Sequence, residues 1–522
     1  MENLSRRQFV RRAASVATIT GAGSLSVRSV FAASVPQTYE VTTDVLVVGA
    51  GAAGLFAAVA AMESGVKRVM VIDKSSIPYL NSTSLSAGLI TASGTEAQKA
   101  AGIHDEHGKD QLAAEIIKTG GGINNRMLVD KFTALGASAF DWLSEHGVEL
   151  TPVDNASFAV RRMHRNQKFS GSAYIDVLFP EAKRLGVEIK MKTKALSLIT
   201  TLEGDHVLGL YAEHRGQKIA IRAEKGVVLA TGGFASNGQM ADNYLLDFPG
   251  VLSSASSLST GDGILMASKI GAGTSHMNYA AVYAYGIPTE PEKRRGVILR
   301  AGVMNLYGSI TVGEDGRRFI QDEASPTSVS NAMVLKQFKK VYVIATKTQV
   351  DDFLKHEPLQ VLGWSQPTFE KELAEQRIFI RAADSIQALA NKLGLDAQTL
   401  SETIGRYNQY VAQGKDEEFN RRYMKGDFTK GPYYGFICQP IALLTLGGLR
   451  VDEHMNVLDV YGKSIKGLYA AGEILGGIHG SSYTGGDSLG AALTLGRLAG
   501  QSVASWHLLR GFLMSFHAFC CA

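Results

Sequence analysis

The sequence predicts an α/β fold, and three observations carry that prediction. Residues 40–48 form a mostly apolar run that ends at the glycine-rich segment 49–54, and a run of small residues follows to about Ser64. Glycine is frequent, with 56 residues, and proline is rare, with 12, which suits many tight turns between strands and helices. The hydrophobic fraction of 45% and the charged fraction of 20% are those of a globular protein, and 522 residues suffice for two or more domains.

The glycine-rich segment has the spacing Gly-x-Gly-x-x-Gly between the first strand and the first helix. Gly49 permits the tight turn, Gly51 lets the backbone approach a pyrophosphate, and Gly54 allows the helix to pack closely on the strand. The helix is expected to open at Ala52 and Ala53, where free N–H groups and the positive end of the helix dipole favour a phosphate. The segment alone is weak evidence, and its place between strand and helix strengthens it.

A second strand, residues 68–72, ends at Asp73, 19 residues after Gly54. A carboxylate in this place can accept hydrogen bonds from ribose hydroxyls. Lys74 follows directly and is a further candidate contact. Strand, glycines, helix, second strand and acid therefore occur in the order of a dinucleotide-binding domain. The alternative is a glycine-rich turn that binds no ligand.

Two later segments indicate that this domain is divided along the sequence. The apolar run 226–230 ends at Thr231 and Gly232, and the run 467–471 ends at Gly472 and Glu473. A further glycine-rich stretch, residues 485–490, then opens a small-residue helix that is expected to reach about residue 500.

Five further stretches decide which family the chain is similar to. They are residues 81–88 (NSTSLSAG), 162–165 (RMHR), 260–263 (TGDG), 316–319 (GRRF) and 445–448 (TLGG). With the glycine-rich segments, they make the chain resemble the fumarate reductase/succinate dehydrogenase flavoprotein family. That family includes flavocytochrome c-like enzymes, urocanate reductases and 3-ketosteroid dehydrogenases. The resemblance covers residues 41–500.

The resemblance implies a Rossmann-like FAD-binding domain with an inserted α+β cap domain that carries part of the substrate site. By analogy, the FAD-binding domain comprises residues 40–275 and 440–508, the cap comprises 276–439, and 509–522 form a tail. Helical patterns inside the predicted cap, at 368–373 and 384–393, agree with this division.

The resemblance also implies individual FAD contacts. Backbone N–H groups that open the last helix would face the flavin pyrimidine edge, where a helix N-terminus stabilises negative charge on the reduced ring. Succinate dehydrogenases attach FAD through a histidine in the stretch that is Asn-Ser-Thr-Ser here, so we expect non-covalent FAD. The implied contacts are Ser82, Thr83, Ser86, Ala87, Gly88, the backbone of Ala195, Asp262, Glu473, Ser488 and Leu489.

The expected substrate site departs from the fumarate reductase pattern. By motif, the proton-donating arginine of fumarate reductases falls at about Pro326, and a carboxylate-clamping arginine falls at Tyr483. The expected histidines fall near Tyr283 and at the pair Leu443 and Leu444. Because arginine supplies bidentate carboxylate recognition, fumarate is not the expected substrate.

Aromatic and apolar residues take these places, as in the ketosteroid dehydrogenase branch. Tyr483 is the leading candidate for a proton donor or carbonyl polariser, and Tyr283 and Tyr285 are further candidates, because a phenol combines an apolar face with a donor. The branch has a second tyrosine where this chain has Thr327, so the match is incomplete. The alternative is that the tyrosines only line the flavin pocket.

Three arginines in the predicted cap are candidates to hold one substrate carboxylate, against the alternative of structural pairing. Arg300 is a candidate site residue, and Arg317 and Arg318 lie in the GRRF stretch. We expect His164 and His479 to be structural.

The net charge of +4 belongs to the N-terminus. Residues 1–33 hold five arginines and one acid, a net of +4, and the remaining 48 basic and 48 acidic residues cancel. This distribution argues against a nucleic-acid partner. Arg6 and Arg7, followed by a weakly apolar stretch and a small-residue site, predict a Tat export signal over residues 1–33. No apolar run reaches the length of a transmembrane helix.

Together these features predict a periplasmic or otherwise exported FAD-dependent oxidoreductase that passes through the Tat translocase. We expect it to reduce a C=C bond of an unsaturated acid or enone in anaerobic respiration, with electrons from a separate cytochrome or quinol-linked carrier. One alternative is a 3-ketosteroid-type dehydrogenase, and another is a non-catalytic flavin electron-transfer or assembly subunit. Three cysteines, Cys438, Cys520 and Cys521, cannot supply a four-ligand metal site.

Overall fold

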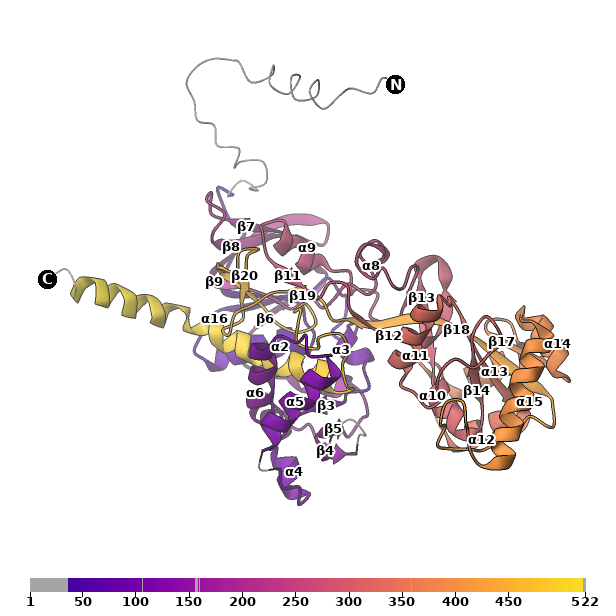
Figure 1. Ribbon diagram of the computed structural model, residues 1–522. Helices are drawn as coiled ribbons and strands as arrows, with labels where there is room; N and C mark the ends of the chain where they lie inside the picture. Colours follow the sequence, from indigo (N-terminus) through magenta and orange to yellow (C-terminus); the bar gives the residue numbers. More distant parts are fainter. Residues whose placement is uncertain (1–35, 106, 155–157, 159, 358, 520–522) are drawn as a thin grey trace, which may run out of the picture.

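A computed structural model describes residues 36–105, 107–154, 158, 160–357 and 359–519. The export signal predicted for residues 1–33 lies outside the described residues, as do Cys520 and Cys521. Figure 1 shows two lobes, with the last helix, α16, extending away from the first lobe. Within the described part of the chain, no helix is both long and apolar enough to span a membrane.

The first lobe is built on an eight-stranded sheet whose central strands are parallel and buried. β1 is flanked by β2 and β9, and successive pairings extend the sheet outward on both sides. The strands in order are β20 (Asn456–Leu458), β21 (Ser464–Ala470), β9 (Gln217–Leu229), β1 (Val41–Val48), β2 (Val69–Ile72) and β6 (Glu188–Lys190), with β8 (Val207–His214) and β7 (Thr193–Thr200) beside β9. This topology confirms the predicted Rossmann-like domain.

Helices pack on this sheet and bury a common apolar core. The last helix lies directly against α2, where small residues allow a close approach. Glycine is needed at Gly496 and Gly500 of the last helix, because a Cβ there would clash with the α2 backbone. The longer helices are α2 (Ala52–Glu63), α5 (Gly108–Thr119), α6 (Arg126–Glu145), α7 (Ser172–Arg184) and α16 (Asp487–Phe519). α16 therefore continues well beyond the predicted end near residue 500.

Shorter elements complete the first lobe around the carboxyl ends of its parallel strands. A small antiparallel sheet joins β3 to β5 and β5 to β4, and a two-stranded sheet joins β11 to β19. These elements are α3 (Ser82–Leu85), β3 (Ile90–Thr91), α4 (Glu96–Ala100), β4 (Leu150–Val153), β5 (Met163–Asn166), α8 (Gly238–Tyr244), α9 (Asp262–Ser268), β11 (Thr274–Ser275) and β19 (Gly448–Leu449).

The second lobe is a mixed sheet covered by helices, which is the cap architecture implied by the resemblance. Its strands are β10 (Leu252–Ser253), β13 (Arg295–Leu299), β12 (Ala280–Glu290), β18 (Tyr433–Thr445), β15 (Val341–Thr346) and β14 (Ile310–Val312), with β16 (Val361–Leu362) and β17 (Ile380–Ala383) at the side. Its helices are η1 (Pro291–Lys293), α10 (Ala301–Met304), η2 (Asn305–Tyr307), α11 (Pro326–Lys336), α12 (Lys347–His356), α13 (Gln366–Glu375), α14 (Ile386–Leu393) and α15 (Ala397–Gln413).

The two long strands β12 and β18 connect the lobes (Figure 1). β18 starts in the cap core, around Phe436, and ends at Thr445 beside the first lobe. The predicted boundary between residues 439 and 440 therefore lies inside a continuous strand. Arg294, between η1 and β13, also ties the cap to α8 through two hydrogen bonds to Asp242, of 2.7 and 2.8 Å.

Candidate active site

The glycine turn after β1 is shaped by backbone contacts that exclude side chains. Gly49 has φ +114°, and a Cβ there would lie 2.2 Å from the carbonyl oxygen of Ala230. A Cβ on Gly54 would lie 1.9 Å from the Gly49 oxygen. β1, the end of β9 and the start of α2 therefore approach one another as closely as the sequence analysis proposed for a dinucleotide-binding turn.

The outer side of the same turn is open. A Cβ on Gly51 would have only the Thr83 hydroxyl within 4 Å, at 3.5 Å, and Gly51, the N-cap residue of α2, has no side chain that could cap the helix. The Ala52 N–H donates to that hydroxyl over 3.1 Å. Ala53 is buried in the first turn of α2. The N-terminus of a twelve-residue helix thus faces space bordered by a hydroxyl, as an anionic ligand requires.

Asp73 supports the turn directly. One of its carboxylate oxygens accepts from the Ala50 N–H over 2.7 Å, and the other accepts from the Ser75 N–H over 2.7 Å. Each oxygen keeps a further lone pair. The carboxylate therefore already fixes the glycine turn, whether or not it also meets a ribose as predicted.

Lys74 and Asp262 form a partly buried ion pair beside this turn, with Nζ 2.9 Å from the carboxylate. Thr260 bridges them, since it accepts from Lys74 over 2.6 Å and donates to Asp262 over 2.8 Å. Burial alone raises the pKa of Asp262, and its bonds to Lys74 and Thr260 more than offset this, so the pKa is lowered. Lys74 and Asp262, which were predicted separately as FAD contacts, therefore lie side by side as an ion pair.

The remaining predicted contacts lie along the same edge. Ser82 hydrogen-bonds Ser259 over 3.0 Å, and Ser86 donates to the Thr83 carbonyl over 2.7 Å. The Thr231 hydroxyl is buried and has no hydrogen-bond partner among the described residues. Four more predicted contacts have mixed surroundings: Ala87 is exposed on the 77–88 segment, Gly88 is buried, Ala195 is buried on β7, and Gly232 has φ +74° after β9.

Glu473 is a partly enclosed carboxyl at the end of β21. It accepts from the Thr445 N–H over 3.1 Å and borders a small pocket together with Gly472, His479 and Ser488. Burial raises the pKa of Glu473 to about 7. A group that titrates near neutral pH in a pocket is a candidate functional residue.

The first turn of α16 holds a second such carboxyl. Asp487 is fully buried before Ser488 and Leu489, and burial raises its pKa to about 7. Asp487 was not among the candidates predicted from the sequence, although it lies in the stretch 485–490. Thr445, which stands in the TLGG stretch, was not among them either.

Two predicted tyrosines meet at the junction of the lobes. The phenols of Tyr283, on β12, and Tyr483, before α16, lie close enough for each to shift the pKa of the other. Burial raises the pKa of both phenols, and the charges of Glu473 and Asp487 raise that of Tyr483 further. Both phenols are therefore protonated at neutral pH.

Apolar and aromatic side chains surround this tyrosine pair. Tyr283 packs beside Leu443 against Ile441. The ring of His479 packs edge-on to Tyr483 at 5.9 Å, and burial lowers the pKa of that histidine to about 4, so it is neutral. The predicted exchange of cations for aromatic and apolar groups is thus visible around the pair.

Two other predicted catalytic residues, Tyr285 and Arg300, make their polar contacts inside the cap. Tyr285 is fully buried in the cap core, and its hydroxyl bonds Thr311 over 3.2 Å. Arg300 donates to the Leu359 carbonyl over 2.9 Å and lies 3.5 Å from Glu357. Thr327 lies in the first turn of α11, where its carbonyl accepts from the Ser330 hydroxyl. The same hydroxyl donates to the carbonyl of Val282, the residue before Tyr283, over 2.7 Å.

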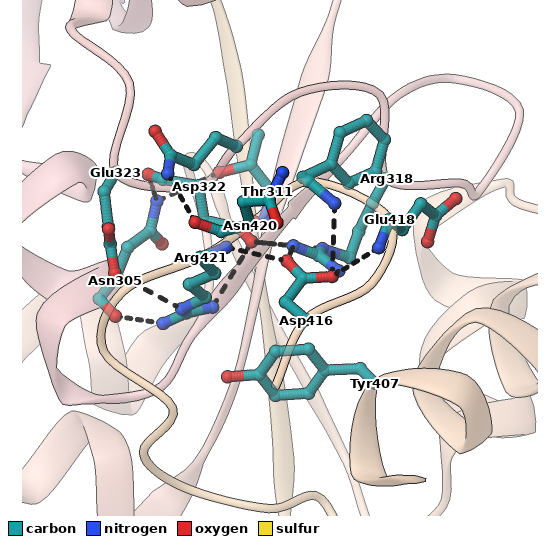
Figure 2. A network of polar contacts seen from close by, with 12 residues as sticks. Asn305, Thr311, Arg318, Asp322, Glu323, Tyr407, Asp416, Glu418, Asn420 and Arg421 are labelled. Carbon is teal, nitrogen blue, oxygen red and sulfur yellow. Dashed lines mark hydrogen bonds and ion pairs between the residues drawn. The ribbon is translucent and has the colours of Figure 1, made fainter. Parts of the chain in front are cut away.

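Arg318, the second arginine of the GRRF stretch, belongs to a buried ionic network inside the cap (Figure 2). Arg318 contacts Asp322 over 2.7 Å and Asp416 over 2.6 Å, and all three side chains are at most 1% exposed. Arg421 lies 3.3 Å from Asp322, and the ring of Tyr407 lies beside both guanidinium groups. Arg318 is thus fully paired with acids of the cap, which supports the alternative that this arginine has a structural role. Arg317 is exposed.

The comparisons with known proteins agree with this geometry. A family model described as an FAD binding domain matches residues 44–489. The chain belongs to this family. A probable fumarate reductase, Ifc3, of Shewanella frigidimarina (strain NCIMB 400) is 32% identical over 469 residues, covering 89% of this chain and 75% of that protein.

A second relative and a solved structure extend the comparison. A urocanate reductase of Eggerthella lenta is 31% identical over 483 residues, covering 90% of this chain and 77% of that protein. The open conformation of a flavocytochrome c3 fumarate reductase superposes with a TM-score of 0.75 at 28% identity, covering 97% of this chain and 82% of that one. The chain is therefore an FAD-dependent oxidoreductase of the fumarate reductase flavoprotein family, as its motifs predicted.

The residues present fit an FAD. The open side of Gly51, the first turn of α2 and the Thr231 hydroxyl border one edge of the parallel sheet, and that hydroxyl has no hydrogen-bond partner among the described residues. That edge, at the carboxyl ends of the strands, is where this architecture binds its ligands.

Proposed function

We propose that the chain reduces a C=C bond of an unsaturated acid or enone, with non-covalent FAD and electrons from a separate carrier. The observation that carries the proposal is the pair of protonated tyrosines at the junction of the lobes. When bound, FAD supplies a hydride from its N5 atom to one substrate carbon. The other carbon then needs a proton, or the conjugated carbonyl needs a hydrogen-bond donor.

Tyr483 is the proposed donor. Two neighbouring phenols carry two O–H groups, so even when one donates to the other, one O–H of the pair remains free to donate outward. If Tyr483 gives up its proton, the neighbouring hydroxyl of Tyr283 can donate to the resulting phenolate. The raised pKa values keep both phenols protonated until the substrate carbon that needs a proton accepts one after hydride transfer.

The surroundings favour a substrate with at most one carboxylate. Arg318 is paired inside the cap, and Leu443 and Ile441 lie beside Tyr283. An apolar wall with phenol donors suits a ring or an enone better than the two carboxylates of fumarate. The similarity to a protein named for urocanate, an unsaturated monocarboxylic acid with a ring, supports this substrate class.

Export and the electron source are also part of the proposal. The twin arginines at Arg6 and Arg7 support passage through the Tat translocase to the periplasm, as part of anaerobic respiration. An enzyme outside the cytoplasm has no nicotinamide pool, so a cytochrome or quinol-linked carrier would supply the electrons. The stretch 81–84 holds no histidine, which supports non-covalent FAD.

A substrate screen tests the proposal. FAD-loaded protein is photoreduced without oxygen, and reoxidation of the flavin is followed with a panel of unsaturated monocarboxylic acids and enones. We expect reoxidation by at least one of them, with a saturated product, and slower reoxidation by fumarate. If no panel member reoxidises the flavin and a partner protein co-purifies, a non-catalytic flavin subunit replaces the proposal.

The tyrosine pair also favours a second candidate, the desaturation of a ketosteroid-like substrate. In that direction a phenol would polarise the carbonyl, bound FAD would take up a hydride from one carbon, and the neighbouring carbon would lose a proton to solvent. Bleaching of oxidised flavin by a saturated 3-ketosteroid would support this candidate over the first.

A further inference from the structure

The segment after β2, residues 75–88, covers the predicted cofactor edge. Its inner face is polar and its outer face is apolar. On its inner face, Thr83 accepts from the start of α2, and Ser82 bonds Ser259. Leu85, next to these residues, points the other way and is 60% exposed. One thickness of chain therefore separates the cofactor edge from solvent.

The outer face carries an exposed apolar cluster, here named the loop patch. Asp176 joins its two sides, because it accepts from the Tyr79 hydroxyl over 2.6 Å and from Lys168, the neighbour of Phe169, over 2.6 Å. Ser170 reaches the Ser84 carbonyl from the same side. The loop patch consists of Ile77, Tyr79, Leu80, Leu85 and Phe169, which are 39–60% exposed.

The rim of the loop patch is basic. Arg165 is exposed and lies over the Phe169 ring, 5.3 Å from its centre. Lys168 is exposed, and Lys192 is exposed beside Ser75, at the start of the segment. Asp176 is an acid of the patch, and it is already shared between Tyr79 and Lys168.

We propose that the loop patch is the docking surface for an acidic one-electron carrier protein. Adjacent exposed apolar side chains with a charged rim mark interaction sites, and aromatic residues are favoured at their centres. The proposal rests on the proposed function, because each C=C bond reduced consumes two electrons and two protons. Two reduced carriers supply the electrons one after the other and leave oxidised, and the protons come from solvent.

The positive charge of the rim favours an acidic carrier protein over a second copy of the chain. A symmetric dimer through the loop patch would place basic groups against basic groups, whereas a carrier with carboxylates around its redox centre would be attracted. Electron-transfer complexes are typically small and short-lived, and a five-residue patch suits such a contact. Docking there also brings a carrier within one chain thickness of the cofactor edge.

The test uses the full FAD-loaded protein and a pre-reduced acidic, low-potential c-type cytochrome, with haem oxidation followed by stopped flow. The patch variant combines Leu85→Ser with Phe169→Asn, because Phe169 has φ +53°, a region that asparagine tolerates. The matched control combines Leu202→Ser with Leu335→Ser, two leucines that are 77% and 85% exposed elsewhere. Flavin reduction by methyl viologen needs no docking and serves as the reference.

We expect the patch variant to lower the second-order rate constant about tenfold or more, whereas the control and the viologen rates stay unchanged. The wild-type rate should fall as salt is added. An unaffected patch variant, an equal loss in the control, or a basic cytochrome that reacts as fast as the acidic one would overturn the proposal. So would a failure of the acidic cytochrome to react while viologen still reduces the flavin. No substrate is present, so these outcomes are independent of the C=C activity.

Discussion

The cap and the first lobe both bury charged groups, and they treat them in opposite ways. In the cap, the carboxylates of Asp322 and Asp416 are balanced by Arg318, at distances of 2.6–2.7 Å, and by Arg421 (Figure 2). Burial alone raises the pKa of Asp416, and the bonds to Arg318 more than offset this, so its pKa is lowered. In the first lobe, Glu473 and Asp487 are enclosed without a cation, and burial raises each pKa to about 7.

This difference separates a structural network from a functional one. A fully paired buried cluster fixes the cap and has no capacity left for a substrate. Buried groups whose pKa values lie near 7, beside two protonated phenols, remain able to exchange protons or meet a ligand. Arg318, which lies in the GRRF stretch, thus has a structural role. The proton donation that we propose is therefore assigned to the tyrosine pair.

The largest expected effect on stability comes from breaking the cap network. Asp416→Asn removes one of the carboxylates that balance Arg318, so the free energy of unfolding should fall by about 3–5 kcal/mol. Urea unfolding measures this change. Asp351→Asn, which breaks an exposed pair with Lys347, is the control and should change stability by at most about 1 kcal/mol. Similar losses in both variants would contradict the contrast between the lobes.

A smaller effect of opposite sign is expected for Asp487→Asn. Because the folded-state pKa of Asp487 is raised, the folded protein binds more protons than the unfolded one between about pH 4 and about pH 7, so the aspartate lowers stability as pH rises through this range. The variant should therefore gain stability over wild type up to about pH 7, by at most about 4 kcal/mol, and the gap should stay constant above. Urea unfolding across this pH range would show it, and a gap independent of pH would refute it.

The smallest expected effect concerns the open side of the glycine turn. Gly51→Ala places a methyl group where only Thr83 lies within 4 Å, so the fold should persist while the methyl obstructs the cofactor. FAD affinity, measured by fluorescence titration of the FAD-free protein, should fall about tenfold. Gly405→Ala, in open space on α15, is the control and should bind FAD as wild type does. Equal affinity in both variants would place the cofactor elsewhere.

Local patterns in the sequence predicted the first lobe well. The strand, the turn at Gly49 and the helix after it depend on neighbouring residues, so their spacing was sufficient. The meeting of Tyr283 and Tyr483, 200 positions apart, followed only from the family resemblance. Asp487 was missed because burial, which raises its pKa, depends on segments remote in the chain such as β3 and α5.

Strand register explains why Tyr285 was grouped with Tyr283. Residues two apart in a regular strand share a face, and the pattern alone predicts that both tyrosines point into one site. The pairing of β12 with β18 shifts between Tyr283 and Gly286, so Tyr285 turns into the cap core. Such an irregularity depends on the partner strand and leaves no local mark in the sequence.

The most direct measurement compares Tyr483→Phe with Tyr285→Phe in steady-state turnover of the substrate found by the screen, with viologen as electron source. Tyr483→Phe should lower kcat by a factor of about 10²–10³ while FAD content stays at the wild-type level. Tyr285→Phe removes a hydroxyl bonded only within the cap core and should leave kcat unchanged. Unchanged turnover in Tyr483→Phe, or an equal loss in both variants, would contradict the assignment of the tyrosine pair as the proton donor.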